Sequence, residues 1–167
     1  MQFIYTQLRR GLLGLFMLGL LAACQSTPET KPLFNAEQVA TLKEQGFNQT
    51  DEGWELSFTD KLLFEFDAAK LTPPSRSAIQ KISAALLKVG ITHMRVEGHT
   101  DNEGTEAYNN KLSLARANVV ADAMSVSGIP RDNITVKGLG MSKPVDSNAS
   151  KAGKAENRRV TIIVSAP

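Results

Sequence analysis

The chain has 167 residues, of which 42% are hydrophobic and 22% are charged. This length and composition suit one globular domain with a short additional segment, and they exclude two large domains. Lysine and arginine number 19 and aspartate and glutamate 17, and the totals become equal once Arg9 and Arg10, which lie in a segment that we expect to be removed, are left out. Nucleic-acid binding depends on a basic surface, so a neutral mature chain argues against a nucleic-acid partner.

Residues 1–23 have the pattern of a lipoprotein signal peptide that is removed. Two arginines precede an apolar run over residues 11–23, which is shorter than the roughly 20 residues that a membrane-spanning helix needs. The run ends in Leu-Ala-Ala-Cys at residues 21–24, which resembles the lipobox of bacterial lipoproteins. The resemblance implies that Cys24, the only cysteine, carries the lipid, including a palmitate, and that Gln25 in place of aspartate directs the protein to the outer membrane. The alternative is that Cys24 is only a small apolar residue of a signal peptide.

A polar segment over residues 24–34 follows, rich in Ser, Thr, Pro, Glu and Lys, and we expect it to be a flexible tether. About ten residues at about 3.3–3.6 Å each reach at most about 35 Å. The next element therefore stays close to the membrane surface.

Residues 35–55 form the next predicted segment, a capped helix followed by the start of a strand. Asn35 as N-cap, with Gln38 three residues later, is typical of a capping box and predicts a helix over residues 35–45. Three apolar side chains of this segment leave two alternatives open, since they either pin the helix to the sheet or form a patch that binds a partner: Leu42, Phe47 and Trp54.

Residues 56–167 alternate between helical and strand patterns. Helices are predicted over residues 73–90 and 105–127, and strands over residues 54–58, 94–98, 134–136 and 160–164, with a polar loop through Asn148. In the second long helix we expect a break near Asn110, and the side chains expected to be buried are Leu112, Ala115, Val119, Ala123 and Val126. Strands separated by helices predict an α/β domain, an α+β sandwich in which two long helices pack on one face of a mixed β-sheet.

The loop between the predicted strand 94–98 and the second long helix is the expected binding site. Asp101 leaves the strand, Gly104 allows a close approach of the backbone, and Arg116 lies on the helix. A carboxylate accepts hydrogen bonds from an ammonium, and a guanidinium offers paired donors to a carboxylate, so Asp101 and Arg116 together suit a zwitterion. The alternative is that Asp101 only caps the next helix and that Arg116 is a solvated surface charge.

Five sequence blocks over residues 56–165 together resemble the OmpA-like peptidoglycan-binding domain. They are Phe64-x-Phe66-Asp67, Gly98-His99-Thr100-Asp101-x-x-Gly104, Asn109-x-x-Leu112-Ser113-x-x-Arg116-Ala117, Gly138-x-Gly140 and Asn157-Arg158-Arg159-Val160. The resemblance implies a pocket for the diaminopimelate of a peptidoglycan stem peptide, in which Asp101 and Arg116 hold the charged end and backbone amides near Gly104 assist. It further implies that Asp67 and either Asn157 or Arg158 line the rim, and that the pocket includes the other matching positions: His99, Thr100 and Asn109.

The stretch over residues 36–58 adds a second resemblance. AEQVATLKEQGF and DEGWELSF are similar to outer-membrane lipoproteins of a periplasmic switch on cyclic di-GMP signalling. This resemblance implies that the partner is a periplasmic repressor of a membrane diguanylate cyclase, held by the lipoprotein so that the cyclase is freed. The alternative is a structural anchor of the Pal lipoprotein type, which tethers the outer membrane to peptidoglycan and needs nothing from residues 36–58. A homodimer is left open as well.

Catalysis is the alternative from another class of function. His99, Asp101 and Ser113 are residue types found in hydrolytic triads, and His99 with Asp101 could begin a metal site. However, no G-x-S-x-G elbow surrounds Ser113, His93 is the only other histidine, and a zinc hydrolase needs three protein ligands. The paired glycines at residues 138–140 lack the third glycine of a dinucleotide fingerprint. We therefore expect no enzyme, no metal and no cofactor.

Overall fold

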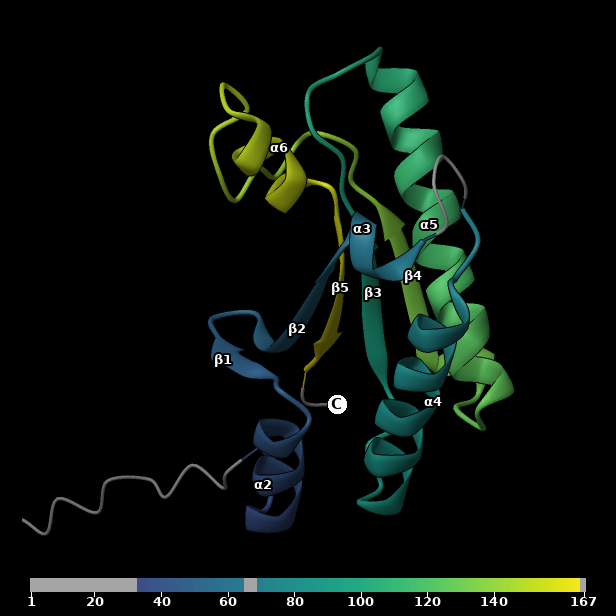
Figure 1. Ribbon diagram of the computed structural model, residues 1–167. Helices are drawn as coiled ribbons and strands as arrows, with labels where there is room; N and C mark the ends of the chain where they lie inside the picture. Colours follow the sequence, from purple (N-terminus) through teal and green to yellow (C-terminus); the bar gives the residue numbers. More distant parts are fainter. Residues whose placement is uncertain (1–32, 65–68, 166–167) are drawn as a thin grey trace, which may run out of the picture. The chain divides into compact units, whose positions relative to one another are not determined.

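The computed structural model describes residues 33–64 and 69–165 (Figure 1). The predicted signal peptide, the lipidation site Cys24, nearly all of the tether and the pocket residue Asp67 lie outside these ranges, so the statements about them stay predictions. Within the described ranges, no helix combines the length and the apolar character that crossing a membrane requires.

Five strands form one mixed sheet. They are β1 (Asn48–Thr50), β2 (Gly53–Thr59), β3 (Met94–Gly98), β4 (Ile134–Gly138) and β5 (Arg159–Val164), in the order β1-β2-β5-β3-β4. Neighbouring strands run antiparallel except β3 and β4, which are parallel. A parallel pair needs a crossover connection, and helix α5 supplies it between β3 and β4.

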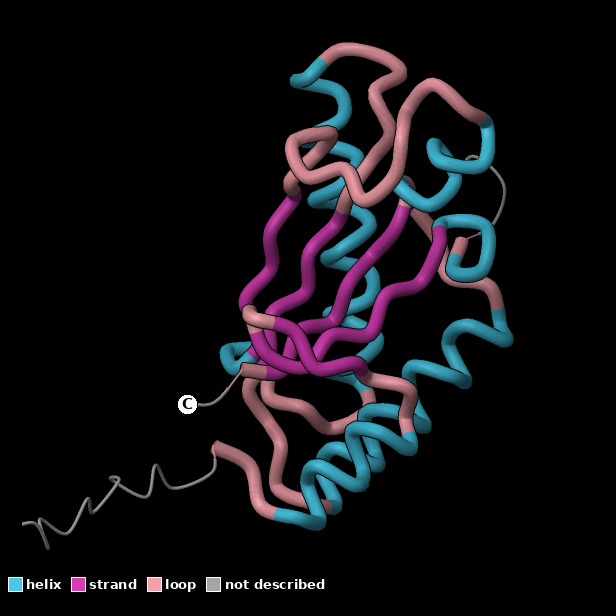
Figure 2. Tube along the Cα trace, turned by 90° about the vertical axis from the view of Figure 1, so that its left-hand side faces the viewer, coloured by secondary structure: helices cyan, strands magenta, loops and turns pink. Residues whose placement is uncertain are grey.

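The two long helices, α4 (Pro73–Lys88) and α5 (Glu106–Val126), cover one face of this sheet (Figure 2). Because side chains alternate along a strand, the register brings Leu56, Ile162 and Val96 side by side across β2, β5 and β3 on one face. Val96 and Ile162 are fully buried in the core, and Leu56 is partly buried against it. The predicted fold class, two long helices packed on a mixed sheet, is confirmed.

Helix α5 lies unusually close to the sheet. A Cβ atom added at Gly98, the last residue of β3, would stand 2.0 Å from the carbonyl oxygen of Ser113, and one added at Gly138 would stand 2.6 Å from the amide nitrogen of Leu114. Only glycine leaves room for such an approach. The close packing brings the N-terminal half of α5 against the loop that leaves β3.

Helix α2 (Ala36–Glu44) has the predicted capping box. The side chain of Asn35 accepts a hydrogen bond from the backbone N–H of Gln38 at 2.8 Å, and the Gln38 side chain accepts one from the Asn35 N–H at 3.0 Å. The Gln38 amide also donates to the carbonyl of Val89, at the end of α4, at 3.1 Å. Helix α2 is therefore fastened to the domain as well as capped.

The segment that carries α2 is part of the main core. Leu42, Phe47 and Trp54 are only 0%, 3% and 5% exposed and belong to the same hydrophobic cluster as the two long helices. The expected apolar surface patch is thus corrected, since these side chains pin the helix to the sheet. The predicted boundary between residues 55 and 56 falls inside β2, so no separate segment ends there.

Helix α5 differs from the prediction in two respects. It runs without a break at Asn110, and its buried face is displaced from the expected one, because Ala115 is exposed and Val126 is 80% exposed. The buried residues of α5 are Asn109, Ser113, Arg116, Ala117, Val120, Ala121, Ala123 and Met124, so Ala123 is buried as expected. Three of the buried residues are polar: Ser113 accepts a hydrogen bond from the backbone N–H of Gly140, and Asn109 and Arg116 line the pocket. A search for apolar periodicity alone therefore assigned the buried face wrongly.

Four short elements were not predicted: β1 (Asn48–Thr50), α3 (Asp60–Leu63), α6 (Lys151–Asn157) and the 3-10 turn η1 (Arg131–Asn133). Helices of this length are too short to show a helical period. Helices α3 and α6 matter for the site, because they lie with the loop after β3 at the end of the sheet drawn at the top of Figure 1. Helix α2 lies at the opposite end.

Candidate functional site

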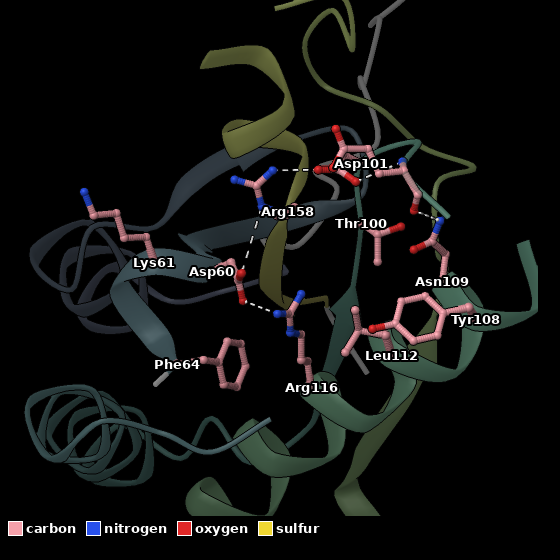
Figure 3. Close-up of a pocket in the computed structure, with 11 residues that line it drawn as sticks. Asp60, Lys61, Phe64, Thr100, Asp101, Tyr108, Asn109, Leu112, Arg116 and Arg158 are labelled. Atoms are coloured by element: carbon pink, nitrogen blue, oxygen red, sulfur yellow. Dashed lines mark hydrogen bonds and ion pairs between the residues drawn. The ribbon is translucent and has the colours of Figure 1, made fainter. Parts of the chain in front are cut away.

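A pocket of about 770 Å³ opens where β3 ends. Four segments line it, namely α3 with the residue after it, the loop following β3, the first half of α5 and the residue that follows α6 (Figure 3). The lining residues are Asp60, Lys61, Phe64, Thr100, Asp101, Glu103, Tyr108, Asn109, Leu112, Arg116 and Arg158. Among these described lining residues, three are acidic and three are basic, so their charges balance.

Four of the charged side chains form a chain of alternating sign (Figure 3). Arg116 Nη2 lies 2.9 Å from Asp60 Oδ1, Asp60 Oδ2 lies 4.0 Å from Arg158 Nε, and Arg158 Nη1 lies 2.6 Å from Asp101 Oδ2. The predicted residues Asp101 and Arg116 both line the pocket, but each is paired with another side chain. Asp60, which the sequence reasoning missed, lies between the two arginines.

Asp101 is held by the loop that it begins. It is 5% exposed, and its Oδ1 accepts a hydrogen bond from the backbone N–H of Glu103 at 3.1 Å. The Asn109 amide donates to the Glu103 carbonyl at 2.9 Å and fixes the same turn, which Gly104 completes with φ +88°. Thr105 is the N-cap of α5, so Asp101 faces the pocket and does not cap the helix.

Arg116 is a buried cation with an unused donor. It is 8% exposed, and its guanidinium carbon lies 5.4 Å from the centre of the Phe64 ring, a distance typical of a cation–π contact. Among the described residues its Nε has no hydrogen-bond partner, and neither does the buried hydroxyl of Thr100. Buried polar groups are nearly always satisfied, so these two atoms indicate where a ligand could bind. The alternative of a solvated surface arginine is wrong.

Asp60 feels opposing influences on its pKa. Burial raises the pKa of this carboxyl above its ordinary value, and the nearby Asp101 carboxylate also raises it, whereas Arg116 and Arg158 lower it. Because burial is the largest of these effects, the ionised form of Asp60 depends on its two arginine partners. Asp60 thus ties the two arginines together electrostatically.

Asn157 lies away from the pocket. It is fully buried, its Oδ1 accepts hydrogen bonds from the backbone N–H groups of Val145 and Asp146, and its Nδ2 donates to the carbonyl of Asp146 and to Oδ1 of Asn148. These four hydrogen bonds of the Asn157 side-chain amide hold the loop over residues 145–148 in place. The expectation that it lines the rim is corrected.

His99 faces the other side of the sheet. It lines a second cavity of about 200 Å³, together with Glu97 and Arg159. Burial lowers the pKa of His99 to about 3, and the positive charges of Arg159 and Lys143 act in the same direction. The Glu97 carboxylate stands 3.8 Å from Nε2 but is engaged by Arg95 at 2.6 Å, so it does not outweigh burial. His99 is therefore neutral and is not part of the diaminopimelate pocket that was expected.

Of the nine predicted pocket positions, the structure places five around the pocket: Thr100, Asp101, Asn109, Arg116 and Arg158. Gly104 shapes the loop beside it. Asp60, Lys61 and Phe64 were missed because α3 had no recognisable pattern. The only sequence signal for Asp60 is that an acidic residue directly follows a strand. It points to the pocket only once β2 is known to lie beside β5, because that pairing brings Asp60 close to Arg158. Among the described residues, no group of three His, Cys, Asp or Glu side chains is placed to hold a metal ion.

Comparison with known proteins agrees with this geometry. Residues 63–158 match the OmpA family. The chain is 53% identical over 155 residues to the outer-membrane lipoprotein YfiB of Pseudomonas aeruginosa, with 92% of each chain covered, and 46% identical over 149 residues to the lipoprotein YfiB of Escherichia coli, with 89% of this chain and 91% of the relative covered. Among solved structures, the cell wall anchor of the T6SS from Pseudomonas aeruginosa is similar with a TM-score of 0.63 and 32% identity, over 78% of this chain and 95% of that chain.

These relatives confirm the predicted location at the outer membrane, facing the periplasm. The alignments cover 92% and 91% of the length of these two relatives, and they include residues before the OmpA region of this chain. The chain therefore belongs to the OmpA family and, within it, to the outer-membrane lipoproteins of the YfiB type.

Proposed function

We propose that this lipoprotein binds peptidoglycan in the periplasm by holding the diaminopimelate of a stem peptide in the pocket between α3, α5 and the loop after β3. The free end of diaminopimelate carries an ammonium and a carboxylate on the same carbon atom. A pocket whose described lining has equal numbers of acidic and basic side chains suits such a zwitterion. The observation that carries the proposal is the buried Arg116, whose Nε has no hydrogen-bond partner among the residues that the structure describes.

The roles follow from the positions of the two predicted residues. Arg116 binds the carboxylate of the ligand, since it keeps donors free while Asp60 and Phe64 hold its orientation. Asp101 accepts from the ammonium. A ligand this small makes few contacts, so the affinity should be moderate and the binding reversible.

Calorimetry tests this proposal. The purified protein should bind a muropeptide that contains diaminopimelate but not its lysine counterpart, because lysine lacks the carboxylate that Arg116 binds. Asp101→Ala and Arg116→Ala should each lose about 2 kcal/mol or more, which is about 30-fold in affinity. Arg131→Ala is the matched control, because Arg131 is exposed and pairs with Asp122 outside the pocket. Unchanged binding in both pocket variants would exclude this site.

We also propose, from the resemblance of residues 36–58, that the protein holds a periplasmic repressor of a membrane diguanylate cyclase and so raises cyclic di-GMP signalling. The YfiB relatives support this proposal only through a match that extends over residues before the OmpA region. Because Leu42, Phe47 and Trp54 are buried, they reach a partner only if α2 moves away from the sheet.

Weakening the cap of α2 tests this second proposal. Asn35→Ala removes the N-cap and should destabilise the helix by about 0.5–2 kcal/mol. If the partner needs α2 released, pull-down of the repressor should become stronger by about 2- to 30-fold. If capture is unchanged, these three side chains belong only to the core. If no repressor is recovered with the wild-type protein, the anchor of the Pal type is the better account.

A further inference from the structure

In the free protein, the position that the ligand's ammonium needs is already filled by a cation. Arg158 lies between two carboxylates, with its Nη1 2.6 Å from Asp101 Oδ2 and its Nε 4.0 Å from Asp60 Oδ2 (Figure 3). A ligand ammonium that binds Asp101 must therefore compete with a guanidinium of the protein itself.

Arg158 is the member of this charge chain that is easiest to move. Its side chain is 36% exposed, whereas those of Arg116 and Asp101 are 10% and 7% exposed. Arg116 also lies over the Phe64 ring. Arg158 follows the end of α6, and a long flexible side chain that already reaches water can leave an ion pair without losing much packing.

We propose that Arg158 occupies the ammonium site of the free pocket, and that the ammonium of the ligand displaces it from Asp101 while Arg116 remains paired with Asp60. This inference rests on the proposed binding of diaminopimelate. The exchange replaces one cation by another, so the buried Asp101 carboxylate keeps a positive partner before and after binding. Leaving a buried carboxylate without a partner is costly.

The exchange makes the pocket selective for stem peptides that are not crosslinked through this amino group. Crosslinking converts the amino group into an amide, which carries no charge. An amide cannot replace Arg158 as the counter-ion of Asp101, so Arg158 stays in place and keeps the crosslinked ligand out. Arg158 is accordingly a specificity-determining residue and not a ligand-binding residue.

Two peptides and two variants test the proposal. The probes are the tripeptide L-alanyl-γ-D-glutamyl-meso-diaminopimelate and the same tripeptide acetylated on the distal amino group. Arg158→Gln removes the competing cation. Arg159→Gln is the matched control, because it removes the same charge from the next residue, whose guanidinium donates to the carbonyls of Asn157 and Lys143 outside the pocket.

In calorimetry with the purified full-length protein, Arg158→Gln should bind the free tripeptide about fivefold more tightly than Arg159→Gln does, the factor expected when a partly exposed ion pair no longer has to be broken. The acetylated tripeptide should gain more than the free tripeptide does, because the side chain that excludes it is gone, so the preference for the free amino group should fall. Weaker or equal binding by Arg158→Gln would overturn the displacement while leaving the proposed function in place. Failure of the wild-type protein to bind the free tripeptide would overturn both.

A measurement on the wild-type protein removes any dependence on how well the variant folds. In ¹⁵N NMR spectra, the Nε–H of Arg158 should exchange faster with water when the free tripeptide is added, and the Nε–H of Arg116 should exchange more slowly. Slower exchange at Arg158 would mean that this side chain binds the ligand, and the displacement would be wrong.

Discussion

Gly98, at the end of β3, has no room for a side chain, because the main chain of α5 passes directly over it. A Cβ atom here would lie 2.0 Å from the carbonyl oxygen of Ser113 and 2.7 Å from its carbonyl carbon. Ordinary contact between such atoms needs about 3.5 Å. Gly98→Ala therefore requires α5 to retreat from the sheet by about 1.5 Å.

The helix cannot make this room by changing a rotamer, since the nearest atoms belong to its backbone and α5 packs on both β3 and β4. Extra methyl groups in a packed core cost about 1–3 kcal/mol when side chains can adjust, so we expect a loss of at least about 3 kcal/mol. With a urea m value of about 1–3 kcal/mol per molar, the unfolding midpoint should fall by about 1–3 M. Binding should weaken too, because Arg116 follows Ser113 by one helical turn.

Urea denaturation, followed by the fluorescence of the single Trp54 and by circular dichroism, measures this loss. Gly90→Ala is the control, since a Cβ there meets nothing within 4 Å and only the left-handed backbone, φ +74°, opposes it. That conformation costs about 1–2 kcal/mol. If Gly98→Ala is no more destabilising than Gly90→Ala, the close packing of α5 on β3 is refuted.

Burial keeps His99 neutral in the folded protein, with its pKa lowered to about 3 from an ordinary value of 6.5. Between these pH values the unfolded chain binds a proton at His99 that the folded protein does not bind. The free energy of unfolding should therefore fall as the pH is lowered from about 6.5 toward 3, by at most about 1.4 kcal/mol per pH unit. In His99→Gln this contribution to the pH dependence should be absent, and an unchanged pH dependence would contradict a neutral, buried His99. Leu42 is fully buried, so Leu42→Ala should lower the free energy of unfolding by about 2–5 kcal/mol, against less than about 0.5 kcal/mol for the exposed Lys43→Ala; equal losses would show that Leu42 is not a core residue. Cys24→Ser should release the protein from the outer-membrane fraction, because each buried CH₂ of an acyl chain contributes about 0.8 kcal/mol to membrane binding; a variant that still sediments with outer membranes in high salt would argue against lipidation.

Features set by local chemistry were predictable from the sequence. The capping box of Asn35 and Gln38 depends on residues three apart, and Thr72 with Pro73 begins α4 through the same local rules. The strands β3 and β5 were likewise predicted from residues that alternate in hydrophobic character along the sequence. Each of these signals lies within a few residues of the element that it specifies.

Features set by contacts between distant segments were not predictable in the same way. Asp60 joins the pocket because β2 lies beside β5, which brings α3 next to Arg158, and no local pattern contains that neighbourhood. Asn157 stands beside Arg158 in the sequence, yet its amide is consumed by the loop over residues 145–148. On α5, Arg116 occupies the inward face that a count of apolar residues assigns to other positions.

A crystal structure of the protein with the diaminopimelate tripeptide tests the central claim most directly. The distal carboxylate of the ligand should lie within hydrogen-bonding distance of Arg116, about 2.7–3.2 Å, with the distal ammonium beside Asp101 and with Arg158 moved away from that carboxylate. A ligand found instead in the cavity lined by His99 and Arg159, or in the pocket without contact to Arg116, would contradict the account.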